Sequence, residues 1–326
     1  MKKLTIICLL LMGYCAKAQV DPHFSQYYAF PLWLNPGMTG GFDGTVRVTA
    51  IYRNQWNSIS APYSTQGLAA DVITNSNINI GASILNQTAG DAGFRYSTGS
   101  LSVAYSGIRF GNGFKQVQIG MNLGFMSRSF DPSKFQFGDQ WDMAVGYNPS
   151  LPTADVITKN YASTLDIGAG VAYLDMTPDK GINMFGGFSA MHLNQPKDPF
   201  LNGIRESLPM RFAVHWGAKV TLTESASITP NILYMRQGNA EEEMVGVSTE
   251  MNLDESSAII FGSNYRMGDA ITPFVGFHYN EFAVGVSYDN NVSQLGKLVK
   301  TTNGYELSLS YVFKKEESKS IPCPRF

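Results

Sequence analysis

The chain has 326 residues, of which 44% are hydrophobic and only 15% are charged. Soluble globular domains usually carry about 25% charged residues, so this composition argues against an ordinary cytosolic surface. The 24 basic and 26 acidic side chains nearly balance, which argues against a nucleic-acid-binding protein, because such proteins present a basic face. The 20 Phe and 16 Tyr residues exclude a disordered chain.

The first residues have the features of an export signal. A positively charged start and an apolar stretch precede residues 16–18, which read Ala-Lys-Ala, an A-x-A cleavage site. We therefore expect residues 1–18 to be a cleaved signal peptide and the mature chain to begin at Gln19. Cys15 allows lipidation as an alternative, although the bulky tyrosine before it is unfavourable for that modification. Cleavage would leave Cys323 as the only cysteine, so no internal disulfide is expected.

The rest of the chain has the pattern of β-strands. No apolar run approaches the 18 residues that a membrane-spanning helix needs, so a membrane structure would have to be a β-barrel. Residues 117–125 are apolar at odd positions and small or polar at even ones, and the same period recurs in residues 165–173 and 282–289. Fourteen such segments begin near Thr45, Ser64, Asn77, Tyr96, Lys115, Ala162, Gly181, Met210, Ala226, Glu243, Ser257, Ile271, Glu281 and Gly304. The fold class we predict is all-β, a transmembrane outer-membrane β-barrel of about 14 antiparallel strands over residues 44–313.

The connections give an independent test of a barrel. Those after even-numbered strands are short, whereas several after odd-numbered strands are long, notably residues 128–161, 194–209 and 290–303. Outer-membrane barrels have short periplasmic turns and longer outer loops, so we expect both chain termini and the tight turns to face the periplasm. The short connection at residues 268–270 breaks this pattern. The last strand, residues 304–313, resembles a barrel-insertion signal, and a soluble periplasmic barrel or sandwich is the alternative.

Enzyme motifs are missing from the sequence. There is no metalloprotease, nucleophile-elbow, P-loop or C-x-x-C motif, and the four histidines are not at metal-ligand spacing. We expect no catalytic, cofactor-binding or metal site, and we expect the acidic run at residues 241–243 to be a solvated loop. A barrel hydrolase is the rival from the enzyme class, and it predicts a histidine hydrogen-bonded to Ser or Asp near one rim.

The segment of residues 19–43 precedes the first strand and is more than a bare barrel needs. We expect it to be a periplasmic or plug segment, with Arg53 and Asn54 placed to hydrogen-bond it from the barrel wall. It carries the motifs D-P-x-F-S-Q-Y and N-P-x-x-x-G, and Y-R-N-Q-W follows at the end of the first strand. The motif residues that we name as candidates for partner binding are Asp21, Pro22, Phe24, Ser25, Gln26, Tyr27, Asn35, Pro36, Tyr52, Arg53, Asn54, Gln55 and Trp56.

These three motifs, in this order, resemble the PorP/SprF family of outer-membrane proteins in the type IX secretion and gliding machinery of the Bacteroidetes. The resemblance covers the signal, the motifs, the length and the barrel pattern, and Gly37 is a departure where Ala is expected. It implies a non-enzymatic component that associates with periplasmic ring and motor proteins. It also implies a role in secreting or attaching a large surface adhesin. Whether the N-terminal motif is a structural plug or a docking site stays open.

The second extra segment is the tail, residues 314–326, which follows the last strand and would hang into the periplasm. Its prolines stiffen an extended peptide, which suits docking to a partner groove or sheet edge. The candidate partner-binding residues here are Pro322, Cys323, Pro324 and Phe326, and a disordered tail with an incidental cysteine is the alternative.

The rival from a different functional class is a porin-like or hydrophobic-substrate diffusion channel. A small or polar inner face suits a hydrated lumen as well as a plugged one. Porins usually carry facing acidic and basic residues at a constriction, whereas the inward candidates in this sequence are mostly Gly, Ala, Ser and Asn. This difference favours the secretion role, with outer-membrane lipid, the secretion machinery and adhesin cargo as partners and with no nucleic acid or cofactor.

Overall fold

A computed structural model describes residues 21–56, 62–74, 76–91, 93–155, 157, 159–197, 207–293 and 303–314. The expected signal peptide, residues 1–18, lies outside these residues, and so does nearly all of the C-terminal tail. Within the described residues, no helix is long and apolar enough to cross a membrane.

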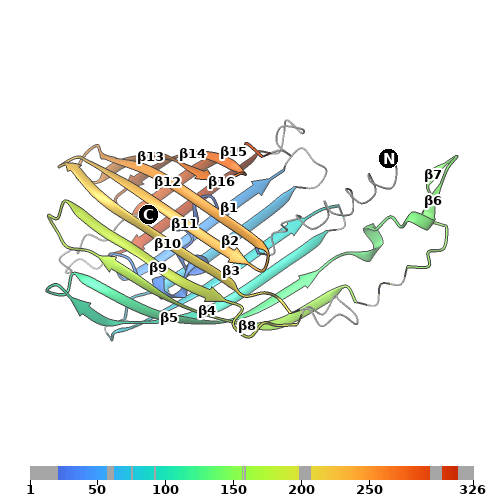
Figure 1. Cartoon of the computed structure of the whole chain (residues 1–326), viewed down its shortest axis with the longest axis horizontal. Helices are drawn as coiled ribbons and strands as arrows, with labels where there is room; N and C mark the ends of the chain where they lie inside the picture. The colour runs from blue at the N-terminus through green and yellow to red at the C-terminus, as the bar shows by residue number, and fades with distance from the viewer. Residues whose placement is uncertain are drawn as a thin grey trace, which may run out of the picture.

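Fourteen antiparallel strands of the described chain close into a barrel (Figure 1). Their order around the barrel follows the chain, and the barrel closes where the first strand pairs with the last, from Val46 opposite Phe313 to Gln55 opposite Gly304. The strands are β1 (Val46–Gln55), β2 (Tyr63–Val72), β3 (Ile78–Ala89), β4 (Phe94–Phe110), β5 (Lys115–Ser129), β8 (Tyr161–Asp175), β9 (Ile182–Met191), β10 (Arg211–Thr223), β11 (Ala226–Gln237), β12 (Ala240–Asn252), β13 (Ser257–Arg266), β14 (Ala270–Tyr279), β15 (Phe282–Asn291) and β16 (Gly304–Phe313).

The short elements lie before and between these strands. The N-terminal segment contains η2 (Tyr27–Ala29), α2 (Pro31–Leu34) and η3 (Pro36–Met38), and the connection from β5 to β8 contains η4 (Pro132–Lys134), η5 (Gly138–Gln140), β6 (Trp141–Asp142) and β7 (Gly146–Tyr147). The small β6–β7 hairpin lies apart from the barrel, at the far end of its connection (Figure 1).

Alternation of side chains explains the barrel. Along β5, Met121, Leu123 and Phe125 are about half exposed and face outward, while Gln118, Asn122 and Met126 are buried and face inward. Since successive side chains of a strand point to opposite faces, one apolar face and one small or polar face suit a cylinder with lipid outside. The predicted fold class is therefore confirmed, and each strand begins within three residues of its expected start.

The two ends of the barrel differ. We call the end where β1 begins and β16 ends the turn end, because every connection there is short, from two residues between β10 and β11 to six between β8 and β9. The opposite end, where β1 ends and the long β5–β8 connection begins, is the loop end. Residues 21–44 run inside the barrel between these ends and are called the lumen segment (Figure 1).

Candidate functional site

The lumen segment begins near the loop end and finishes at the turn end. The backbone N–H of Asp21 donates to the side chain of Gln237, the last residue of β11, at 3.2 Å. Further along, the Tyr27 hydroxyl donates to Asn231 in the middle of β11 at 2.9 Å. The Gly40 N–H donates to Asp71, near the turn end of β2, at 2.8 Å. The segment therefore spans much of the lumen and contacts strands on several sides.

An ionic cluster fastens the D-P-x-F-S-Q-Y motif to the wall, and we call Ser25, Arg53, Arg266, Asp289 and Glu306 the Arg53 cluster. The Arg53 guanidinium lies 2.7 Å from Asp289 and 3.1 Å from Glu306, and Arg266 lies 3.1 Å from Asp289. Ser25 joins both sides, because its hydroxyl donates to Asp289 at 2.7 Å and its backbone N–H donates to Glu306 at 2.6 Å. Buried charges need such partners, so the cluster couples the motif to four strands.

Three further contacts extend the Arg53 cluster along the motif. Arg53 also donates to the backbone carbonyl of His23. The Gln26 backbone N–H donates to Glu306 at 2.8 Å, and the Ser308 hydroxyl donates to the Gln26 side chain at 2.8 Å. Consecutive residues of the motif are thus held by β1 and β16, the two strands that close the barrel.

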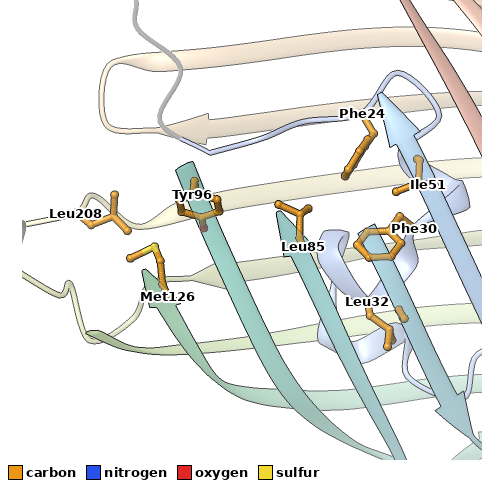
Figure 2. Close-up of a cluster of buried hydrophobic side chains, with 9 residues drawn as sticks. Phe24, Phe30, Leu32, Ile51, Leu85, Tyr96, Met126 and Leu208 are labelled. Atoms are coloured by element: carbon orange, nitrogen blue, oxygen red, sulfur yellow. The ribbon is translucent and has the colours of Figure 1, made fainter. Parts of the chain in front are cut away.

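An apolar cluster lies beside these charges. Figure 2 shows Phe24, Phe30 and Leu32 of the lumen segment with Ile51, Leu85 and other buried side chains of the wall. The rings of Phe24 and Phe30 pack edge to face with centroids 5.8 Å apart. Burial of a large apolar side chain contributes about 1.5–3 kcal/mol, so this cluster stabilises the seated segment together with the charges.

The N-P-x-x-x-G motif is held in a notch that glycines leave in the wall. Asn35 caps η3 by accepting from the Gly37 N–H at 2.8 Å, and its amide donates to the Val171 carbonyl at 3.0 Å. A Cβ on Gly120 of β5 would lie 2.2 Å from the Pro36 carbonyl oxygen, and one on Gly170 of β8 would lie 2.0 Å from the Asn35 side chain. The wall is therefore glycine there because the segment packs directly against its backbone.

The last glycine of that motif has a backbone reason of its own. Gly40 has a φ of +73°, and a Cβ there would lie 2.4 Å from Asn79. Next to it, Arg47 of β1 pairs with Asp71 at 2.7 Å and also donates to the Met38 carbonyl. The turn that leads from the lumen segment into β1 is thus fixed by one glycine and one buried ion pair.

A second ionic cluster holds the start of the lumen segment, and we call His192, Asp21, Asp166 and Arg211 the His192 cluster. His192 Nε2 lies 2.6 Å from Asp21 and its Nδ1 lies 2.7 Å from Asp166. Arg211 lies 3.3 Å from Asp21 and stacks over the Trp33 ring at 4.3 Å. Both ring nitrogens of His192 are bonded to carboxylates, so neither is left to activate a serine as a hydrolase would require.

The charges of the His192 cluster are coupled. Burial alone would lower the pKa of His192, but the carboxylates of Asp21 and Asp166 raise it to about 9. Burial would likewise raise the pKa of Asp21, yet His192 and Arg211 hold it well below its ordinary value. An imidazolium between two carboxylates is therefore the stable form at neutral pH. Within the described residues, no group of three or more His, Cys, Asp or Glu side chains could hold a metal ion.

The structure brings some predicted site residues together and separates others. Arg53 meets the lumen segment as expected, but Asn54 lies on the other face of β1, where its amide donates to the Tyr52 hydroxyl at 3.4 Å. Trp56 follows β1 at the loop end and packs on the Tyr63 ring. Gln55, the last residue of β1, is partly buried beside them. The buried motif residues are Asp21, Pro22, Phe24, Ser25, Gln26, Tyr27, Asn35 and Pro36.

The tail candidates cannot be placed in the same way. Pro322, Cys323, Pro324 and Phe326 lie outside the described residues.

Two sequence expectations about charge are wrong. The acidic run at residues 241–243 lies in β12 and not in a loop: Glu241 and Glu243 are exposed as expected, but the Glu242 side chain is only 10% exposed and its carboxylate lies 3.8 Å from His23. The inward face is also not free of facing charges, since the Arg53 cluster and the Arg47–Asp71 pair lie there. Both differences have one cause, because the alternation of a strand turns charged side chains at these positions toward the lumen. Asp289 and Glu306 stand at such positions in β15 and β16, and that signal could have found them.

Three comparisons set this geometry beside known proteins. The sequence model of the family described as type IX secretion system membrane protein PorP/SprF matches residues 16–311. Among solved structures, the barrel is similar to the toluene transporter TbuX of Ralstonia pickettii, with a TM-score of 0.50 and 11% identity over 86% of this chain and 93% of that chain. It is similar to the toluene transporter TodX of P. putida, with a TM-score of 0.50 and 9% identity over 86% and 93%. At such identities the likeness shows the fold alone. The search of curated proteins finds no match.

Proposed function

This chain belongs to the PorP/SprF family of type IX secretion system membrane proteins, and from that premise we propose that it is a non-enzymatic anchor in the outer membrane. In this role its outer loops hold or assist a large secreted adhesin, and its periplasmic end contacts ring and motor proteins. The buried motif residues act by seating the lumen segment, while the tail residues around Cys323 contact the machinery.

The observation that carries this proposal is the occupied lumen. Residues 21–44 fill the barrel from near the loop end to the turn end, and ionic clusters and an apolar cluster hold them there. A barrel filled in this way offers its two ends, rather than its interior, for contact with other molecules. The same observation argues against the diffusion channel, because a solute would have to displace a segment that hydrogen-bonds to the buried Arg53 cluster and pairs with His192 through Asp21.

The test is a pull-down of the tagged protein from native outer membranes in mild detergent, with co-purifying proteins identified by mass spectrometry. We expect secretion-ring components and a large surface protein in the eluate. A chain lacking residues 315–326 is run beside it, and we expect this deletion to remove the ring components while leaving the surface protein.

Two controls make the result decisive. Heat-dependent migration on electrophoresis checks that each barrel is folded, and single-channel conductance measures the open lumen. A folded barrel that is recovered alone, with or without its tail, and that conducts steadily would overturn the anchor and support the channel.

A further inference from the structure

A hollow of about 530 Å³ opens on the outer wall of the barrel, across the neighbouring strands β2, β3, β4 and β5 (Figure 1). Leu68, Ile84 and Phe125 line it, and each of these outward side chains is about half exposed. Gly99 of β4 lies opposite Ile84 on one side and opposite Phe125 on the other, so the wall has no side chain between these two. A volume of this size is typical of sites that bind small molecules.

The wall itself does not require a glycine at position 99. A Cβ there would have the Ile84 side chain as its nearest neighbour at 3.6 Å, an ordinary van der Waals distance, whereas one on Gly120 would lie 2.2 Å from the Pro36 carbonyl oxygen. The φ of Gly99 is not positive, and its pairing with β3 and β5 is regular. Glycine weakens the interior of a strand, and apart from bulges it marks places where another molecule or backbone approaches closely. The open space at Gly99 therefore points outward, to a molecule that lies against the wall.

The hollow lies at the border of the apolar band that faces lipid. On its turn-end side, Leu101 and Leu123 are the next outward residues of β4 and β5, and both are more than half exposed. On its loop-end side, the next outward residues of β3, β4 and β5 are Asn86, Ser97 and Ser127. The edge of the apolar band on a membrane barrel marks the border between acyl chains and headgroups. The hollow therefore lies where the chains of a lipid join its polar part.

A row of neutral polar side chains lines the loop-end side of the hollow, and we call Gln66, Asn86, Ser97 and Ser127 the polar row. They lie opposite one another on β2, β3, β4 and β5. The Ser97 hydroxyl donates to the Asn86 side-chain oxygen at 2.7 Å, which fixes this amide. Neighbouring strands are about 4.8 Å apart, so the polar row is about 14 Å wide. Amides and hydroxyls both donate and accept hydrogen bonds, as the hydroxyl groups of a sugar require.

A positive charge stands beyond the polar row. Arg95 is exposed and lies on the same outward side of β4 as Ser97 and Gly99. Its neighbours across the two ladders are Thr88 and Ser129, and neither carries a negative charge. A guanidinium is always charged and binds phosphate through two parallel hydrogen bonds. The outer wall thus presents an apolar hollow, a polar row and a cation in this order toward the loop end.

We infer that this hollow, called the Gly99 hollow, is a binding site for a phosphorylated glycolipid of the outer leaflet. One acyl chain lies over Gly99 between Ile84 and Phe125, sugar hydroxyls hydrogen-bond to the polar row, and a phosphate pairs with Arg95. A glycerophospholipid would fill the apolar part, but it has no sugar to match the polar row. The inference rests on the proposed function only in that the barrel lies in the outer membrane with its loop end outward.

The first experiment is native mass spectrometry of the detergent-purified barrel, titrated with diphosphoryl lipid A, an acylated and phosphorylated disaccharide. The unchanged chain retains one lipid molecule. Gly99→Leu fills the hollow and lowers the affinity about tenfold, because the acyl chain loses its apolar contacts. Ala82→Leu is the matched control, since it adds the same side chain to the exposed outer face of β3 outside the hollow, and it leaves binding unchanged. Equal binding by the unchanged chain and Gly99→Leu would overturn the inference.

The second experiment tests the headgroup with two further probes, phosphatidylglycerol and lipid A without its phosphates. The unchanged chain binds diphosphoryl lipid A about tenfold more tightly than either probe, because only this lipid meets both the polar row and the arginine. Arg95→Gln removes the preference for the phosphorylated form. Arg109→Gln keeps it, since this arginine is exposed at the turn end of the same strand. Equal affinity of the unchanged chain for phosphatidylglycerol and diphosphoryl lipid A would overturn the choice of a glycolipid.

The outcomes separate this inference from the proposed function. Lipid binding is measured on the barrel alone, and heat-dependent migration confirms that each variant is folded. If the unchanged chain retains no lipid A, the Gly99 hollow is not a glycolipid site and the anchor role stands. If lipid A binds as expected but the pull-down recovers neither ring components nor a surface protein, the anchor role is wrong and the lipid site stands.

Discussion

The lumen segment and the loop-end part of β8 are opposites in almost every physical respect. The lumen segment is buried and packs against glycines of the wall. It is held by hydrogen bonds from Ser25 to the Arg53 cluster and by the buried pair of Asp21 with His192. The loop-end part of β8 and the β6–β7 hairpin carry exposed apolar side chains, including Leu165, Met143 and Val145. The segment with the most recognisable sequence is thus the one that outside partners reach least.

This contrast assigns different work to the two regions. A buried motif is constrained by the wall around it, so its residue types are those that fit and close the lumen. An exposed surface is constrained little by packing and can serve partners of varied sequence. Changes in the lumen should therefore alter stability and leave partner choice alone, and changes at the loop end should do the reverse.

The largest loss of stability is expected for Arg53→Met, which keeps a side chain of similar length and removes the charge. Asp289 and Glu306 would lose the arginine that lies within about 3 Å of both, and breaking a buried pair typically costs about 3–5 kcal/mol. Denaturant unfolding in detergent or lipid measures the change. Arg236→Met is the matched control, because this arginine is exposed and bonds only to the backbone of the adjacent turn in the described contacts. Equal stability of the two variants would show that the Arg53 cluster does not fasten the segment.

The next largest effect is a pH dependence of how strongly the His192 cluster holds the lumen segment inside the barrel. The folded-state pKa of His192 is raised to about 9 from 6.5, so its contribution is complete below about pH 6.5 and is lost as the pH rises to 9. The difference between these two pKa values corresponds to about 3 kcal/mol of folding stability by linkage. The pKa of Asp21 is lowered, so its contribution is present above its ordinary value of about 4 and is lost only in stronger acid.

Limited proteolysis of the N-terminus between pH 5 and pH 10 checks this dependence. Cleavage should increase steeply between pH 7 and pH 9.5 in the unchanged chain, because the imidazolium between Asp21 and Asp166 loses its proton. His192→Gln should remove most of that increase and raise cleavage at pH 6. A profile that is flat in the unchanged chain would contradict the ionic role of His192.

A smaller effect is expected where glycine meets the lumen segment. Gly120→Ala places a methyl group 2.2 Å from the Pro36 carbonyl oxygen, so η3 must shift, and overpacking of this kind costs about 1–3 kcal/mol. Gly99→Ala is the control, since it lies on the neighbouring β4 with its nearest contact at 3.6 Å. Thermal unfolding compares them, and a loss in both variants would point to a general cost of losing glycine in a strand.

These positions also show which parts of the structure the sequence can predict. Alternation predicted the fourteen strands because each strand is long and its apolar face meets lipid, so the local pattern and the environment agree. The role of Gly120 or Asp289 could not be read in that way. Each is defined by a neighbour far along the chain, Pro36 in one case and Arg53 in the other. The two-residue period of a strand predicts the face on which a side chain lies. It does not predict the residue that the side chain contacts, because that residue depends on which segment fills the lumen.

The smallest effect on stability, and the sharpest test of the comparison, is at the tip of the β6–β7 hairpin. Met143 is fully exposed and Val145 is 79% exposed, so replacing both with serine removes no buried contact and should change stability by less than about 0.5 kcal/mol. Exposed apolar side chains on a hairpin that lies apart from the barrel (Figure 1) mark a contact site, so recovery of the surface protein should fall severalfold. Trp141 is kept, because it packs against Tyr147 across the hairpin with ring centroids 6.0 Å apart. The opposite result would be unchanged recovery for the double serine variant and lower recovery for a folded Arg53→Met barrel. It would show that partner binding depends on the lumen segment and not on the hairpin.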